Sequence, residues 1–335
     1  MFIFYTIFIS LITTLTVFFS KKKALAYDSD FTKPQAIHTS NTPRVLGIPL
    51  FFILIFFIFV PNSIDNIYLK IFLISLLCAI FGLLEDFGFK FNPYLRFLFQ
   101  LIIVSLTVLF IDLIDPLKPF KFLPSYFANN IFMTIFTIFS ILTIANSLNF
   151  IDGCNGLVIL YVTAISFIIY FISLDINIKT YLIFIIIYLI IILLFNFPKS
   201  FAFLGDFGAY FLGFNFSFLF IFLNNTQISF NMPVNDWFFA NLFVYPSFEI
   251  FSTVLRRLRK NQSPFYPDNL HLHSLLYRII NHKASSLFAN YSTSLIIFLI
   301  NILIFINLFN VSIEYFYLNY FVFFILFYIF RYFIV

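Results

Sequence analysis

Long apolar runs recur along the whole chain, and they constrain its fold more than any other feature. Residues 1–20, for example, carry no charged side chain. Because ~20 residues at ~1.5 Å of rise cross ~30 Å of hydrocarbon as a helix, each such run is a candidate transmembrane helix. Only 10% of the 335 residues are charged and 62% are hydrophobic, which is too little polar surface for a soluble protein of this length. We therefore expect an all-α, polytopic integral membrane protein.

About eleven segments are long and apolar enough to be predicted as membrane spans. They are residues 1–20, 45–61, 67–84, 96–112, 129–148, 156–174, 180–197, 207–224, 236–255, 292–310 and 314–332. The sequence shows no internal repeat and no soluble second domain, so residues 1–335 are expected to form a single transmembrane domain. The first span is expected to be retained. Its lysines follow the apolar run, whereas a cleaved signal peptide carries its positive charge before that run.

The basic residues are distributed unevenly between the two sets of loops. With eleven crossings, all but four of the 19 lysines and arginines fall on one side, the four being Lys70, Lys118, Lys121 and Lys179. Positive charge marks the cytoplasmic side. This predicts a periplasmic N-terminus, a cytoplasmic C-terminus and a cytoplasmic position for the loops that carry nearly all the unusual polar residues. The cytoplasmic loops are expected at about 21–44, 85–96, 149–156, 198–207 and 256–287.

Several functional classes are disfavoured by the composition. The two cysteines, Cys78 and Cys154, predict neither a disulfide framework nor a thiolate metal site. No basic polar domain with interleaved aromatic residues is present, so a nucleic-acid partner is not expected.

Two acidic motifs lie in the predicted cytoplasmic loops. Glu85 and Asp86 end an apolar segment, and adjacent carboxylates can supply a general base or bind a divalent cation. A solvated helix end would also explain the pair. Asp206 lies between Gly205 and Gly208 at the mouth of another apolar segment, where the amides of a helix N-terminus would favour an anion such as phosphate. An N-cap role would explain this acid equally well.

An asparagine-rich loop separates two predicted spans. Asn146, Asn149, Asp152 and Asn155 fall within eleven residues that also contain two glycines. Amide and carboxylate oxygens beside a glycine backbone suit a closely approached ligand. A tight interhelical turn would not require two asparagines at a spacing that shares one helix face.

The longest predicted cytoplasmic loop is rich in basic residues and histidines, namely Arg256, Arg257, Arg259, Lys260, His271, His273 and His282. A membrane-surface anchor would explain the basic run. The histidines lack zinc-type spacing, and cations and imidazoles beside an acid-rich site suit a diphosphate. Mg²⁺ bridges carboxylates to substrate phosphates, so the loops together predict phosphoryl-type transfer that depends on Mg²⁺, with Mn²⁺ as the alternative cation.

At this point the motifs become recognisable as a set. The chain resembles the polyprenyl-phosphate N-acetylhexosamine-1-phosphate transferases of glycosyltransferase family 4, in particular the bacterial undecaprenyl-phosphate GlcNAc-1-phosphate transferase branch. The motifs that carry the resemblance, in order, are residues 38–47, 82–96, 146–157, 203–213 and 256–273.

The resemblance implies an activity and its central residues. HexNAc-1-phosphate, by default GlcNAc-1-phosphate, would move from a UDP-sugar to undecaprenyl phosphate. The products would be UMP and a lipid-diphosphate sugar that begins a cell-envelope glycan such as the lipopolysaccharide O-antigen. Asp206 and Asn149 would hold Mg²⁺ against the diphosphate, and Asp86 with Glu85 would deprotonate or position the lipid phosphate. A homodimer is left open.

The remaining residues are implied to bind substrate. They are Phe203 (stacked on uracil), Asp152 and Asn155 (lining the nucleotide site), Arg259, His271 and His273 (meeting the diphosphate or sugar), and Arg96 or Lys90 (replacing a usual lysine as a phosphate contact).

Several positions depart from the family pattern, among them the end of the last motif, where Ser274 follows His273 and the family usually ends His-His. Glu85 stands where the first acid is usually Asp, Tyr94 lies where a Lys is usual, and Asn155 stands where a second Asp is frequent. Glu249 also replaces an Asp. These departures put substrate choice and rate in doubt. They leave a catalytically inactive family paralogue as one alternative, and a flippase or transporter of lipid-linked sugars is the alternative from another functional class.

Overall fold

Helices form nearly all the regular structure of the protein. The computed structural model describes residues 1–28, 41–60, 64–110, 117, 129–225, 229–265 and 269–334. Over these residues, β structure is confined to an antiparallel pair of two-residue strands, β1 (Tyr27–Asp28) and β2 (Thr42–Pro43), and two isolated bridges. The prediction of an all-α polytopic architecture is confirmed.

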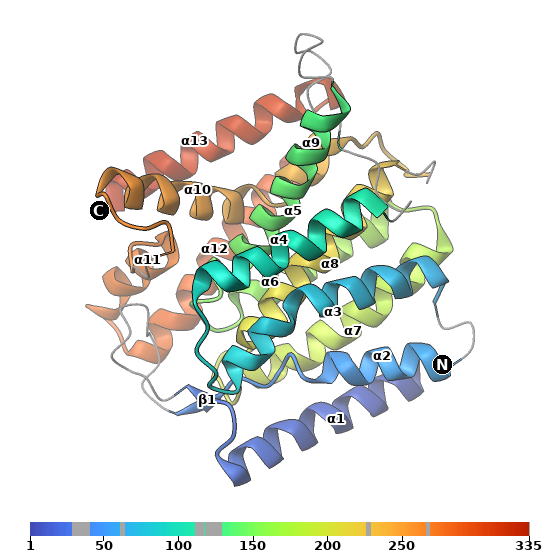
Figure 1. Cartoon of the computed structure of the whole chain (residues 1–335). Helices are drawn as coiled ribbons and strands as arrows, with labels where there is room; N and C mark the ends of the chain where they lie inside the picture. The colour runs from blue at the N-terminus through green and yellow to red at the C-terminus, as the bar shows by residue number, and fades with distance from the viewer. Residues whose placement is uncertain are drawn as a thin grey trace.

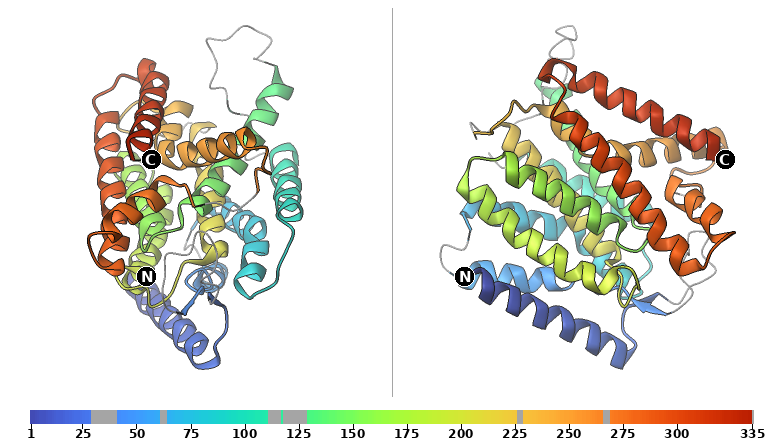
Figure 2. Two further views of the ribbon diagram at one scale, coloured as in Figure 1. Left: turned by 90° about the vertical axis from the view of Figure 1, so that its left-hand side faces the viewer. Right: turned by 180° about the vertical axis from the view of Figure 1, so that it is seen from behind.

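Figure 1 shows how the helices are arranged. In chain order they are α1 (Phe2–Lys23), α2 (Pro49–Phe59), α3 (Asn66–Asp86), α4 (Pro93–Phe110), α5 (Asn130–Ile151), α6 (Leu157–Ile172), α7 (Ile176–Asn196), α8 (Gly205–Asn225), α9 (Asp236–Asn241), α10 (Val244–Arg259), α11 (Leu272–Asn281), α12 (Ser286–Leu308), the 3₁₀ helix η2 (Ile313–Tyr315) and α13 (Phe316–Ile334). Seen from behind, α12 runs obliquely across the bundle beside α6 (Figure 2).

Eight helical segments among the described residues are long and apolar enough to cross a membrane. They are α1, α3, α4, α5, α7, α8, α12 and the segment Ile313–Ile334. The apolar helices α2 and α6 are shorter, and the last residues of the predicted spans 45–61 and 96–112 lie outside the described part of the chain. The count of eleven spans is therefore not confirmed.

The predicted span 236–255 is divided between two helices. It forms the short helix α9 and the amphipathic helix α10, whose last turn is basic. In one continuous helix, the ring of Pro246 would clash with the carbonyl of Leu242 and would remove a backbone donor. The chain turns before this point, so that Pro246 falls in the first turn of α10, where proline is tolerated.

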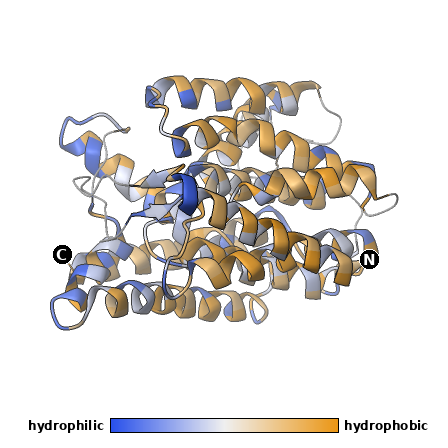
Figure 3. Ribbon diagram, turned by 90° about the horizontal axis from the view of Figure 1, so that it is seen from below, coloured by the Kyte–Doolittle hydropathy of each residue, from blue (hydrophilic) through white to orange (hydrophobic). Residues whose placement is uncertain are grey.

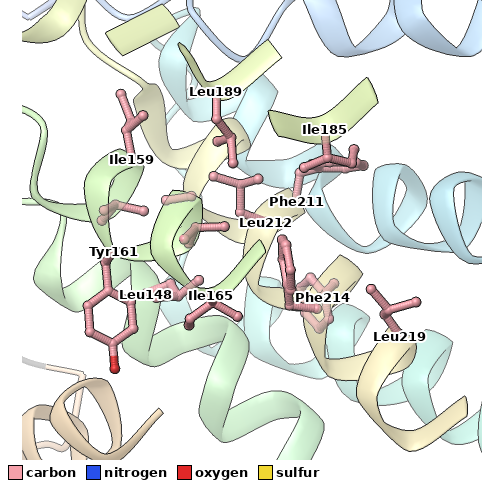
Figure 4. Close-up of a cluster of buried hydrophobic side chains, with 14 of the residues drawn as sticks. Leu148, Ile159, Tyr161, Ile165, Ile185, Leu189, Phe211, Leu212, Phe214 and Leu219 are labelled. Carbon is pink, nitrogen blue, oxygen red and sulfur yellow. The ribbon is translucent and has the colours of Figure 1, made fainter. Parts of the chain in front are cut away.

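Helix α8 is the centre of the bundle. Its residues are buried almost without exception from Gly205 to Leu223, and α3 and α5 pack most closely against it. Small residues permit this approach: a Cβ added to Gly213 would lie 2.5 Å from Cα of Ala145 in α5. Figure 4 shows the apolar side chains of α5, α6, α7 and α8 that meet around this axis, with Phe211 and Phe214 among them.

The alternation of helix directions creates one polar end of the bundle. We call it the site face: α3, α5, α7 and α10 end there, and α4, α6 and α8 begin there. In Figure 1 the C-terminus lies at this end and the N-terminus at the other. Hydropathy colouring shows mostly apolar helices, with hydrophilic residues gathered toward the helix ends (Figure 3). The helix ends thus bring residues from distant parts of the sequence together.

Replacing Gly213 by Val is expected to separate α5 from α8 and lower stability by about 1–3 kcal/mol, because the added atoms would overlap the backbone of Ala145. Thermal unfolding of the detergent-purified protein would measure this. Leu77→Val is a suitable control, since Leu77 is 56% exposed on α3 and faces away from the packed interior. Equal melting temperatures for Gly213→Val and the native protein would contradict this account of the packing.

Candidate functional site

A cavity of about 510 Å³ opens at the site face. It lies among the converging ends of α4, α5, α7, α8, α10 and α11. The residues that line it are Arg44, Arg96, Phe97, Phe139, Leu142, Thr143, Asn146, Asn149, Phe150, Asp152, Gly153, Cys154, Asn155, Asn196, Phe203, Gly205, Asp206, Ile250, Phe251, Val254, Arg257, Pro264, Phe265, His271 and His273. One part of the lining is polar and charged, and the part between α5 and α10 is apolar.

Most of the site residues predicted from the sequence meet in this cavity. Those in its lining are Arg96, Asn149, Asp152, Asn155, Phe203, Asp206, His271 and His273. Glu85, Asp86 and Arg259 are not part of the lining that the described residues form. Glu85 and Asp86 nevertheless contact lining residues, namely Arg96 and Asp206.

Asp206 occupies the first turn of α8 and faces the polar part of the cavity. The Nδ2 atom of Asn149 donates a hydrogen bond of 3.0 Å to its Oδ1, and Nη1 of Arg44 lies 3.9 Å from its Oδ2. The carboxylate side chain remains 31% exposed. Asp206 is thus fixed by two neighbours and is still accessible to a ligand in the cavity.

Asp86 is buried behind Asp206 and caps the start of α8. Its two carboxylate oxygens accept hydrogen bonds from the backbone N–H groups of Asp206 (2.9 Å) and Phe207 (3.0 Å). The first N–H groups of a helix have no partner within the helix and carry partial positive charge, so a carboxylate stabilises them. Gly205 makes the contact possible: its φ is +82°, and a Cβ there would lie 2.5 Å from Oδ2 of Asp86.

Glu85 is paired with an arginine of the cavity. Its Oε2 lies 2.5 Å from Nη1 of Arg96, and the Arg96 guanidinium also lies over the ring of Tyr210, 5.3 Å from the centroid. A charge-assisted hydrogen bond of this kind fixes the direction of a guanidinium. Lys90, the other replacement considered for the missing lysine, is exposed and does not line the cavity.

The asparagine-rich loop is held by hydrogen bonds to residues of two other helices. Oδ1 of Asn290 in α12 accepts the N–H of Asn155, and Oδ1 of Asn196 in α7 accepts the N–H of Gly156. The side chain of Asn155 donates to the carbonyl of Pro198 at 3.0 Å. These contacts hold Asp152 at the cavity, where burial, and then the nearby charge of Asp206, raise its pKa to about 7.

The two histidines are packed together at the start of α11. Their rings are stacked with centroids 5.3 Å apart. Nδ1 of His273 lies 3.4 Å from the hydroxyl of Tyr245, and its Nε2 lies against Gly153, where an added Cβ would be 2.4 Å away. Burial, and then the neighbouring His271, lower the pKa of His273 to about 3. His273 is therefore neutral at physiological pH and acts as a hydrogen-bonding group.

The arginine that reaches the cavity from α10 is Arg257. It is 4% exposed, its guanidinium lies 5.4 Å from the centroid of the Phe150 ring, and it donates to the carbonyl of Pro264. Arg259, which the resemblance implied as a contact of the diphosphate or sugar, is exposed. The helical spacing explains the difference, since residues two apart on a helix point in different directions.

Other site residues had a sequence signal that was not assigned a role. Arg44 lies in the motif 38–47, whose residues 38–40 fall outside the described residues. Glu249 is a fully buried acid within an apolar segment, and ionisable residues in such segments are functional candidates by default. Asn196 ends an apolar helix, and only the fold shows that it binds the asparagine-rich loop.

The donor atoms fit a hard cation that is shared with a substrate. Within the described residues, no three His, Cys, Asp or Glu side chains gather closely enough to bind a metal ion by themselves. Asp206 and Asn149 instead offer oxygen donors at the edge of the cavity. Mg²⁺ is commonly bound by one or two carboxylates together with substrate phosphates, and this donor set is compatible with that arrangement.

Residues 68–224 match the sequence model of glycosyl transferase family 4. We refer to these residues as the family 4 region, after the model to which they are similar. This region includes the acidic pair, the asparagine-rich loop and Asp206, whereas α10 and α11 follow it.

Two curated relatives have the same name, undecaprenyl-phosphate alpha-N-acetylglucosaminyl 1-phosphate transferase. The chain is 36% identical to the protein of Haemophilus influenzae over 81 residues, which cover 24% of this chain and 22% of the relative. It is 36% identical to that of Pasteurella multocida over 77 residues, which cover 23% of this chain and 21% of the relative. The alignments thus span about a fifth of each relative, and the resemblance to family 4 is confirmed.

Gly205→Ala is expected to lower the melting temperature of the detergent-purified protein. The new methyl group would displace the Asp86 carboxylate from the start of α8 and would force a left-handed backbone on alanine. The cost is expected to be about 1–3 kcal/mol. Gly88→Ala is a matched control, because Gly88 also has a positive φ of +91° but has no atom within 4 Å of its Cβ position. An equal loss in both variants would show that backbone strain alone, and not the Asp86 contact, is responsible.

Asp152 is expected to make stability fall as the pH rises from about 4 to about 7. Its pKa is raised from 3.8 to about 7 on folding, so over this range the folded state holds a proton that the unfolded state has lost. Each unit of difference in pKa between the folded and the unfolded state corresponds to about 1.4 kcal/mol of folding free energy. Asp152→Asn removes this dependence. The stability of the variant relative to that of the native protein should therefore be higher at pH 8 than at pH 5. Melting temperatures without divalent cations would test this, with the exposed Asp65→Asn as control. The same relative stability at both pH values would contradict it.

Proposed function

We propose that the protein transfers HexNAc-1-phosphate, with GlcNAc as the first candidate sugar, from a UDP-sugar to undecaprenyl phosphate. An oxygen of the lipid phosphate would attack the β-phosphorus of the donor. The bond from that phosphorus to the bridging oxygen would break, and UMP would leave with the bridging oxygen. The product would be undecaprenyl-diphosphate sugar, the starting point of a cell-envelope glycan. The reaction would take place at the cytoplasmic face of a bacterial inner membrane.

The observation that supports this proposal most strongly is the two-part lining of the cavity. Its polar part holds Asp206 and three arginines, Arg44, Arg96 and Arg257. Its apolar part, between α5 and α10, includes Phe139 and Phe251. A lipid phosphate has the same division into an anionic head and an apolar tail. The named activity of the two relatives and the family 4 match agree with this interpretation.

The reaction must bring two anions together, and the polar part of the cavity is suited to that task. Arginine forks neutralise and orient phosphate oxygens. Asp206 and Asn149 would hold Mg²⁺, or Mn²⁺ in its place, which when bound would draw charge from the diphosphate. Phe203, Asp152 and Asn155 would bind the nucleotide, and His271 and His273 the diphosphate or sugar.

Glu85 and Asp86 are assigned a positioning role in this proposal. Asp86 uses both carboxylate oxygens to hold the start of α8, and hence Asp206. Glu85 holds Arg96. The two acids would therefore act on the lipid phosphate through Asp206 and Arg96.

The decisive test is UMP release by the purified protein with undecaprenyl phosphate, Mg²⁺ and a panel of UDP-HexNAc donors. We expect UMP only when the lipid is present, and a loss of about 100-fold or more in Asp206→Asn. Lipid movement without UMP formation would favour a flippase. Folded protein that neither forms UMP nor moves lipid would favour an inactive paralogue.

Arg257→Gln is expected to lower kcat/KM more than Arg259→Gln, by about tenfold or more, because only Arg257 lines the cavity. The same UMP assay would compare the two variants. Lys179→Gln is the control, since Lys179 lies in the first turn of α7, away from the site face. A larger loss in Arg259→Gln would contradict the assignment and restore the prediction made from the sequence.

A further inference from the structure

The backbone on both sides of His271 is held by side chains from two different helices. Oε1 of Glu249 in α10 accepts the N–H of Leu272 at 2.7 Å. Nε of Arg331 in α13 donates to the carbonyl of Leu270 at 3.3 Å. Between these contacts, Nδ1 of His271 lies 3.1 Å from Oε2 of the same glutamate. Glu249 and Arg331 thus hold three consecutive residues, Leu270, His271 and Leu272.

Glu249 has little reason to be buried unless it serves these contacts. Its side chain is 0% exposed, and burying a carboxylate is costly unless it is paired and hydrogen-bonded. Both of its oxygens are used, one by a backbone amide and one by an imidazole. Leu272 begins α11, and His271 at its N-cap makes no side-chain capping hydrogen bond. Glu249 therefore supplies from α10 the cap that α11 lacks.

These contacts determine where the two histidines of the cavity lie. His271 stacks on His273, so a change in the backbone at Leu272 would move both rings. Arg331 lies in the last turn of α13, which packs along α10. Both clamping residues follow the family 4 region, which ends at residue 224.

We propose that Glu249 and Arg331 are positioning residues that clamp the backbone on either side of His271 and hold the histidine pair in the wall of the cavity. The carboxylate accepts the hydrogen on Nδ1 of His271 and so orients the ring. The identity of the ligand that the histidines meet rests on the proposed function, whereas the existence of the clamp does not.

Hydrogen–deuterium exchange of the full chain in nanodiscs would test the clamp directly. Glu249→Leu removes both acceptors and is expected to speed exchange at Leu272 and the following amides about tenfold or more. Glu249→Gln keeps one carbonyl acceptor and should show a smaller increase. Arg331→Gln should also speed exchange there, and both changes should accelerate modification of His271 and His273 by diethyl pyrocarbonate. Glu314→Gln, an exposed acid at the opposite end of the α13 segment, is the control.

Exchange and modification that stay at native rates in Glu249→Leu would overturn the clamp, whatever the activity of the protein. Where the native protein releases UMP, Glu249→Gln should lower kcat more than it raises KM, with a native melting temperature. Native kcat in Glu249→Leu would overturn the positioning role even if exchange rises. A protein that releases no UMP but shows faster exchange and modification in the variants would support the clamp and count against the proposed transfer reaction alone.

Discussion

The contact between Asp86 and the start of α8 is the interaction on which the site depends. Helix α8 is buried almost throughout, so the free N–H groups of its first turn cannot be satisfied by bulk water. The end of α3 supplies a carboxylate for two of them. The same contact requires Gly205, because any side chain there would overlap Asp86. Asp206 directly follows Gly205. The contact that satisfies the N–H groups at the start of α8 therefore also places an acid at the cavity.

Other parts of the polar lining are likewise held by residues that do not themselves line the cavity. Arg96 is held by Glu85, and the asparagine-rich loop is held by Asn290 of α12. In a bundle with little water inside, an unpaired polar group is costly, and such supporting contacts are required for stability as well as for orientation. Substitution of a supporting residue should therefore alter both the stability of the protein and the orientation of the side chain that it holds.

The sequence predicted the all-α architecture, and most of the predicted site residues line the cavity, because both depend on local patterns. Apolar runs indicate helices, and polar residues between runs indicate loop ends that share a face. The structure differs from the expectation at points that depend on tertiary packing. Span 236–255 is apolar enough overall, but the chain turns before Pro246 and so divides it between α9 and α10. The choice of Arg259 over Arg257 depended on the direction of a helix face, which the motif alone does not fix.

Tyr94 shows how a departure from the family pattern can be accommodated. Its hydroxyl lies 2.8 Å from Oγ of Ser263, and its ring packs 4.6 Å from that of Phe265, centroid to centroid. Phe265 lines the cavity, so Tyr94 joins the start of α4 to the segment that follows α10. A lysine would supply a charge to the cavity, whereas this tyrosine supplies a wall contact. The cation at this side of the cavity is instead Arg96, two residues later, whose direction is fixed by Glu85. Glu85, the acid that differs from the usual Asp, thus pairs with Arg96, the residue that the resemblance implies as a replacement for the usual Lys.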